Sequence, residues 1–154
     1  MSDVINGTEN IIQPGTARAA LVDFYRAFNQ RELPRMAECW LHSDLASMSN
    51  PLGGVKRGWE EIGSVYEKIF TGTAQVYVEF YDFQIYETEM MFCAAGRERG
   101  YLKTAENKID LAIRTSRVYL NQQGRWLQMH HHGSIDQAEL LARYQKAVLQ
   151  QAHA

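Results

Sequence analysis

The chain has 154 residues, of which 16 are Lys or Arg and 18 are Asp or Glu, so its formal net charge at pH 7 is −2. This length suits one domain with a substantial core. The near balance of charge excludes the basic field with which proteins attract nucleic acid or anionic membranes, so we expect no nucleic acid and no membrane as partners.

Residues 1–13 are polar and follow neither a helical nor a strand period, which predicts a flexible arm or an extension that contacts a partner. A single domain is expected over residues 14–154. The first 15 residues lack the basic and apolar regions of a secretory leader, and no apolar run approaches the roughly 20 residues that cross a bilayer. The expected location is therefore the cytoplasm.

Three helices are predicted in the first half of the chain. Apolar residues recur at intervals of three and four over 16–30, which is typical of an amphipathic helix. Pro34 suits the first turn of a shorter helix over 34–41. A third apolar stripe predicts a helix over 58–70.

From residue 74 the period changes from helical to alternating, which predicts a sheet. Asp136 is a good N-cap for a further helix that continues to the end of the chain. The expected strands are a short one at 45–48 and long ones at 74–87, 90–103, 108–121 and 125–135.

Four stretches together resemble a known group of proteins: AALVDFYRAFNQRELPRMAECW, WLHSDLASMSNPLGGVKRGWEEI, MMFCAAGRERGYL and SRVYLNQQGRWLQMHHHGS. The spacing of Arg117 to Gly124 and Trp126, followed by His-x-His-x-Ser, is its most specific part. The chain resembles the SnoaL-like branch of the nuclear transport factor 2-like superfamily, close to the association domain of calcium/calmodulin-dependent kinase II and its bacterial stand-alone relatives. The resemblance implies an α+β fold, a cystatin-like cone whose strongly curved mixed sheet wraps around the N-terminal helices. The C-terminal helix would be an addition.

Alternation along the last strand separates two faces. Leu127 and Met129 are apolar, so their side is expected to face the cone interior together with His131. The opposite, convex face is a common dimer surface in the resembled superfamily, so we expect a homodimer or larger ring there. The contact would include Trp126, Gln128, His130 and His132. The last two could share a metal, but no third ligand is apparent and no metal is expected.

Arg117 is the leading candidate for ligand binding. The resemblance implies that it lines the deep pocket and meets carboxylate ligands; the alternative is a salt bridge to a buried acid. Tyr119 shares its face of the strand. Arg97 could add positive potential from the neighbouring strand, unless the register slips by one and it pairs at the surface. Trp59 and Tyr66 are expected to form an apolar wall, or otherwise to belong to the core.

The sequence is compatible with acid-base catalysis but does not require it. Enzymes of the resembled superfamily use a carboxylate base with a tyrosine, or a His-Asp pair. His131 is therefore the candidate catalytic residue. The sequence does not distinguish which acid would accompany it among Asp23, Glu79, Asp82 and Asp110.

Two functions are compatible with these features. One is a small-molecule binding protein of SnoaL-like type, with or without isomerase, cyclase or dehydratase chemistry on a small carboxylate or carbonyl compound. The other is a non-catalytic homo-oligomeric assembly module. No cofactor motif is present. A pocket of a few hundred Å³ beside a carboxylate and a His or Tyr would favour an enzyme, whereas a cone filled by aromatic residues would favour assembly.

Overall fold

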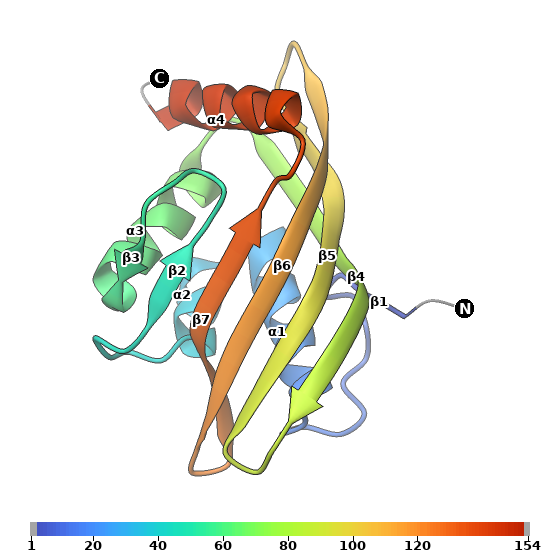
Figure 1. Cartoon of the computed structure of the whole chain (residues 1–154), viewed down its shortest axis with the longest axis vertical. Coiled ribbons are helices and arrows are strands. Elements are labelled where there is room, and N and C mark those ends of the chain that lie inside the picture. The colour runs from blue at the N-terminus through green and yellow to red at the C-terminus, as the bar shows by residue number, and fades with distance from the viewer. Residues whose placement is uncertain (1–2, 153–154) are drawn as a thin grey trace.

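The structure, a computed structural model, describes residues 3–152 (Figure 1). The predicted helices and long strands are confirmed, with bounds that differ by a few residues. In chain order the elements are β1 (Val4–Ile5), α1 (Ala17–Asn29), α2 (Leu33–Cys39), β2 (Ser47–Ser49), β3 (Lys56–Arg57), α3 (Gly58–Thr71), β4 (Gln75–Glu87), β5 (Met91–Lys103), β6 (Lys108–Gln122), β7 (Arg125–Ser134) and α4 (Ala138–Ala152).

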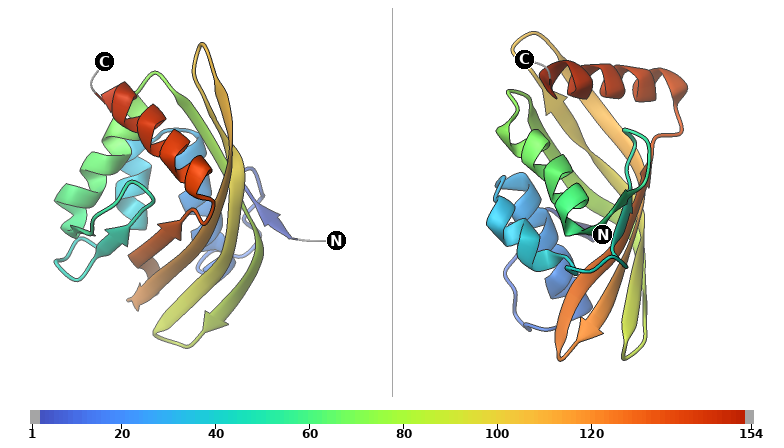
Figure 2. Two further views of the ribbon diagram at one scale, coloured as in Figure 1. Left: turned by 45° about the horizontal axis from the view of Figure 1, so that its top comes forward. Right: turned by 90° about the vertical axis from the view of Figure 1, so that its left-hand side faces the viewer.

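The strands form one mixed sheet in the order β1-β4-β5-β6-β7-β2-β3. Neighbouring strands are antiparallel except β2 and β7, which run parallel. The sheet curves around α1, α2 and α3, which cover its concave face (Figure 2). This arrangement confirms the cystatin-like α+β cone, and the cone interior lies between the three helices and the long strands.

Close approach of strands β4 and β5 depends on glycine. A Cβ at Gly100 would lie 1.8 Å from the carbonyl oxygen of Tyr77, so no other residue fits there without moving the backbone. Further along, the register shifts between Tyr81 and Gln84. Asp82 occupies this bulge with φ 49°, and bulges of this kind increase the twist of the sheet.

The beginning of the chain is packed more closely than the sequence predicts. Ile5 in β1 is fully buried, and β1 pairs with β4. Arg26 of α1 donates hydrogen bonds from Nε to the carbonyl of Gly7 (2.7 Å) and from Nη2 to that of Glu9 (2.6 Å). Residues 4–9 therefore lie against the domain, inside the stretch that the sequence predicts as an arm over residues 1–13. Residues 1 and 2 lie outside the described part.

Helix α4 lies across one end of the cone, over the sheet and beside α3 (Figures 1 and 2). Leu140 and Tyr144 bury their side chains beneath it. Gln145 donates a hydrogen bond from Nε2 to the carbonyl of Pro51 at 3.0 Å, in the loop between β2 and β3. Across residues 3–152, no helix combines the length and apolar character that crossing a membrane demands.

Candidate functional site

A buried ion pair lies at the centre of the cone. The alternation of β5 and β6 points Glu98 and Arg117 inward, and their side chains are 6% and 3% exposed. Arg117 Nη2 lies 2.9 Å from Glu98 Oε2, Nη1 donates to Gln128 Oε1 at 2.9 Å, and Nε donates to the hydroxyl of Tyr25 at 3.2 Å. The Tyr25 hydroxyl in turn donates to Glu98 Oε2. Each nitrogen of the guanidinium thus has a partner within the protein.

The guanidinium also contacts an aromatic face. Its central carbon lies 3.8 Å from the centre of the Phe24 ring, a cation–π distance. Burial lowers the pKa of Arg117, but the neighbouring Tyr25 and Glu98 more than offset this and raise the pKa above its usual value. Arg117 therefore stays charged, and Glu98 balances that charge inside the cone.

A cavity of about 60 Å³ adjoins this ion pair, and its lining includes Glu98, Arg117, Tyr66 and His131. The sequence-predicted residues Arg117, His131 and Tyr66 are therefore brought together. His131 is 7% exposed. Burial, and then the charge of Arg117, hold the pKa of its imidazole well below the usual 6.5. His131 is consequently neutral near pH 7, and can offer a hydrogen bond but not a positive charge.

Several buried polar atoms carried by β6 and β7 have no hydrogen-bond partner among the described residues. They are His131 Nδ1, Gln128 Nε2, Thr115 Oγ1 and the hydroxyl of Tyr119. An unpaired buried polar atom costs about 1–3 kcal/mol, so such atoms are rare in stable cores. Two of these atoms belong to Gln128, which accepts a hydrogen bond from Arg117, and to His131, which lines the cavity beside it.

Arg97, which the sequence predicts as a source of positive potential for the pocket, does not line this cavity. It is exposed and pairs with Asp82 at 3.1 Å, from Nε to Oδ2. The pairing of β5 with its neighbouring strands points Glu98, and not Arg97, toward the cone interior. This is the register shift of one residue that the sequence left open. Glu79 likewise pairs with Arg99 on the convex face, and Asp110 is exposed, so neither they nor Asp82 can act as a base in the cone.

A bulge in β7 also corrects the predicted faces. Val118 of β6 pairs with His130, but the next residue, Tyr119, pairs with Gln128, so the register shifts between them. The extra residue, Met129, reverses the alternation on its N-terminal side. Gln128 is therefore fully buried, and Trp126 packs edge-on against Phe92. Both were predicted on the convex face, and both face the cone.

The faces predicted for the three histidine side chains agree with the structure. His131 faces the interior, while His130 and His132 lie on the other side of β7. His130 Nδ1 is 2.7 Å from the hydroxyl oxygen of Ser47 on the adjacent strand. Within residues 3–152 no cluster of three or more His, Cys, Asp or Glu side chains is arranged to hold a metal ion.

Tyr119 and Asp23 belong to a different pocket. This pocket has a volume of about 510 Å³ and lies between α1, α2 and the hairpin that joins β6 to β7. Asp23 is at its rim, 56% exposed, and partial burial raises the pKa of its carboxyl against the effect of Arg26 and Arg35. Tyr119 stacks on Phe92 with ring centres 4.4 Å apart and is not among the residues that line the cavity beside Arg117.

Trp59 is also displaced from its predicted position. Its ring stacks on His42 at 5.2 Å and lies 6.4 Å from Tyr66. It therefore supports Tyr66 from behind and does not line the cavity. Sequence reasoning missed Glu98, Gln128 and Tyr144. Only Glu98 had a detectable signal, as the acid between two arginines on an alternating strand.

Comparison with known proteins identifies the same architecture. A model of the SnoaL-like domain matches residues 17–137, and no curated protein matches significantly. A Xanthomonas campestris structure, provisionally described as a calcium/calmodulin-dependent protein kinase II association domain, superposes with a TM-score of 0.67 and 19% identity over 87% of this chain and 99% of its own.

Two further structures superpose over most of the cone. A Streptomyces avermitilis protein, provisionally described as a dehydratase of the NTF2-like family, has a TM-score of 0.67 and 19% identity over 77% of this chain and 92% of its own. A ketosteroid isomerase-like protein from Erwinia carotovora atroseptica has a TM-score of 0.64 and 16% identity over 78% and 93%. At these identities the likeness is one of fold.

Proposed function

Because the chain belongs to the SnoaL-like domain family, we propose that its cone binds a small neutral compound, whose carbonyl group lies beside Arg117 and His131. One observation carries this proposal. The cavity next to the ion pair is lined by a guanidinium whose charge is already balanced, by a neutral imidazole and by apolar side chains. Such a surface offers hydrogen bonds but no net charge.

The presence of Glu98 supports one of the two ligand groups that the sequence left open. A carboxylate entering the cavity would lie close to a second buried carboxylate, and two like charges in a poorly solvated site repel strongly. A carbonyl oxygen can accept a hydrogen bond from Arg117 or His131 without adding charge. The site therefore favours a ketone, ester or amide over a carboxylic acid.

Binding without turnover is the function that the geometry supports best. A general base works best when its pKa is near the working pH, whereas the pKa of His131 is well below its usual value. Glu98 already accepts hydrogen bonds from Arg117 and Tyr25.

An NMR titration with two ligands of equal shape tests the proposal. We expect 2-butanone to shift the backbone amide signals of Arg117 and His131 in a saturable manner, and propanoate to leave them unchanged at the same concentrations. His131→Ala should weaken the binding of 2-butanone, while His132→Ala, one residue along on the convex face, should not. Equal shifts with propanoate, or no saturable shift with the ketone, would reject a neutral carbonyl site.

The same sample can test for catalysis. A base in the cone would exchange the α-hydrogens of 2-butanone for deuterium in D₂O faster than buffer does, and one-dimensional proton NMR records this loss. We expect the protein not to accelerate the exchange. Acceleration that His131→Ala abolishes would instead assign acid-base chemistry to the site.

Self-association is a second candidate property, favoured by the convex face of the sheet. Cys93 and Val118 lie partly exposed on the neighbouring strands β5 and β6, and His130 and His132 continue this surface onto β7. We propose that this surface mediates a homodimer or larger ring. Light scattering after gel filtration should give at least twice the chain mass of 17.7 kDa; a monomer at micromolar concentration would contradict it.

A further inference from the structure

The cavity beside Arg117 is too small for a whole ligand. One water molecule occupies about 30 Å³ of liquid, so a cavity of about 60 Å³ has room for roughly two non-hydrogen atoms. A carbonyl carbon and oxygen would fill it. The rest of any ligand held there must extend out of this cavity, and the neighbouring surfaces indicate where it would go.

An outer pocket of about 180 Å³ adjoins the cavity beneath α4. Its walls are mostly aliphatic, with Lys56, Ser64 and Lys68 among the few polar residues that line it. By the same measure it can hold about six non-hydrogen atoms. The aliphatic lining comprises Leu52, Val65, Ile69, Val76, Leu102, Val148 and Leu149.

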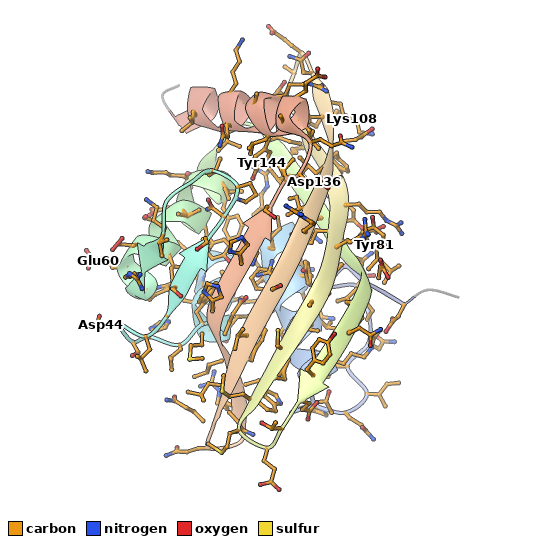
Figure 3. All side chains as sticks on the ribbon, viewed as in Figure 1. Asp44, Glu60, Tyr81, Lys108, Asp136 and Tyr144 are labelled. Atoms are coloured by element: carbon orange, nitrogen blue, oxygen red, sulfur yellow. The ribbon has the colours of Figure 1, made fainter. Side chains whose placement is uncertain are left out.

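Tyr144 lies between the two spaces and contributes to the lining of both, as do Val65, Ile69 and Val76. Its side chain lies beneath α4, on the side of the helix that faces the cone (Figure 3). Burial, followed by the charge of Glu98, raises the pKa of the phenol to about 12. The wall that the two pockets share therefore includes an uncharged phenol ring carried by α4.

The outer pocket depends on the part of the chain that lies beyond the matched domain. The family model ends at residue 137, and α4 begins at Ala138. Tyr144, Val148 and Leu149, which form the roof of the outer pocket, all come from this added helix. The compartment therefore includes side chains from outside the part of the chain that the family model matches.

We propose that the outer pocket holds the apolar tail of the compound whose carbonyl lies beside Arg117, so that the ligand is an aliphatic carbonyl compound with a tail of about six carbon atoms. Tyr144 turns aside to let the tail pass. This inference rests on the proposed function, because the inner cavity must accept the carbonyl end. Its physical basis is the shared wall of the two spaces and the aliphatic lining of the outer one.

A series of methyl ketones from 2-butanone to 2-decanone tests the inference by isothermal titration calorimetry. Each methylene that enters the pocket should tighten binding roughly fourfold. The gain should cease once about six carbon atoms beyond the carbonyl are buried. Alkanes and 1-alkanols of matched length serve as probes for apolar binding that does not involve the carbonyl.

Two variants of α4 localise the tail. Val148→Phe fills the outer pocket and should abolish the gain with chain length, so that the longer ketones bind no more tightly than 2-butanone does. Ala142→Phe adds the same side chain at an exposed position of the helix and should bind the whole series like the unmodified protein. If Val148→Phe disturbs folding, Leu149→Ala, at a position that is 52% exposed, should instead reduce the gain severalfold.

The outcomes distinguish this inference from the proposed function. If all ketones bind equally well, or if Val148→Phe and Leu149→Ala keep the full dependence on chain length, the tail does not lie in the outer pocket although the carbonyl site stands. If alkanes bind as well as ketones, or if no ketone binds, the carbonyl site itself is rejected, and the inference fails with it.

Discussion

Replacing Arg117 by methionine should destabilise the protein strongly, because it leaves Glu98 buried without a cation. At the observed separation of 2.9 Å, the attraction between the two charges is about 6 kcal/mol at an effective dielectric constant near 20. Part of this only compensates the cost of burying the charges. Removal of one partner of a buried pair typically costs about 3–5 kcal/mol, which is a large share of the roughly 5–15 kcal/mol that holds a domain folded.

Urea unfolding of four proteins measures this effect: the unmodified chain, Arg117→Met, Glu98→Gln and the double variant. The double variant should be at least about 2 kcal/mol more stable than the sum of the two single losses predicts, because neither charge is then left alone. Arg97→Met is the matched control on the convex face, where the ion pair with Asp82 is solvent-exposed; it should change the free energy of unfolding little.

The reasoning would be refuted if Arg117→Met lost less than about 1 kcal/mol, or if the losses from the two single variants were simply additive. Either result would mean that solvent or another group balances Glu98. The central ion pair would then not account for the choice of a neutral ligand, and a carboxylate would again be an open possibility.

Three further predictions concern the buried His131, the convex face of the sheet and the packing of β4 against β5. Burial lowers the pKa of His131, so as the pH falls the unfolded chain takes up a proton near pH 6.5, before the folded chain does. The free energy of unfolding should therefore be highest above about pH 7 and should fall in acid by up to about 1.4 kcal/mol per pH unit. Urea unfolding at pH 7, 6 and 5 should show this loss in the His132→Asn control, and a smaller loss in His131→Asn. Val118→Arg should convert the proposed dimer to a monomer in light scattering without lowering the melting temperature by more than a few degrees; an unchanged mass would exclude the convex face as the contact. Gly100→Ala should destabilise the chain by more than about 1–3 kcal/mol, because its Cβ would meet the carbonyl of Tyr77, and a melting temperature equal to that of the unmodified chain would contradict the close approach of β4 and β5.

The sequence predicts most of the fold because helices and strands follow local periods. The stripe over 16–30 and the alternation from residue 74 both depend on residues that are close in the chain. A β-bulge, in contrast, produces no periodic pattern in the sequence. The additional residue at Met129 reverses the pattern of β7, and so the inward positions of Trp126 and Gln128 were predicted on the wrong face.

The candidate site was harder to predict because its contacts are between distant residues. Arg117 could be assigned to the interior from its strand, but its partner Glu98 sits between two arginines where apolar residues give no guide to register. The choice between Arg97 and Glu98 depends on the pairing of β5 with β6. Likewise, Tyr144 of α4 lines the inner cavity together with residues of the cone. No local pattern in the sequence predicts this contact between distant parts of the chain.

A crystal structure of the protein grown with 2-heptanone tests the central claim most directly. The account predicts the carbonyl oxygen within hydrogen-bond distance, about 3 Å, of Arg117 or His131, and the carbon chain beneath α4 beside Tyr144. Density for the ketone in the pocket between α1 and α2, or a carbonyl pointing away from Arg117 and His131, would contradict it.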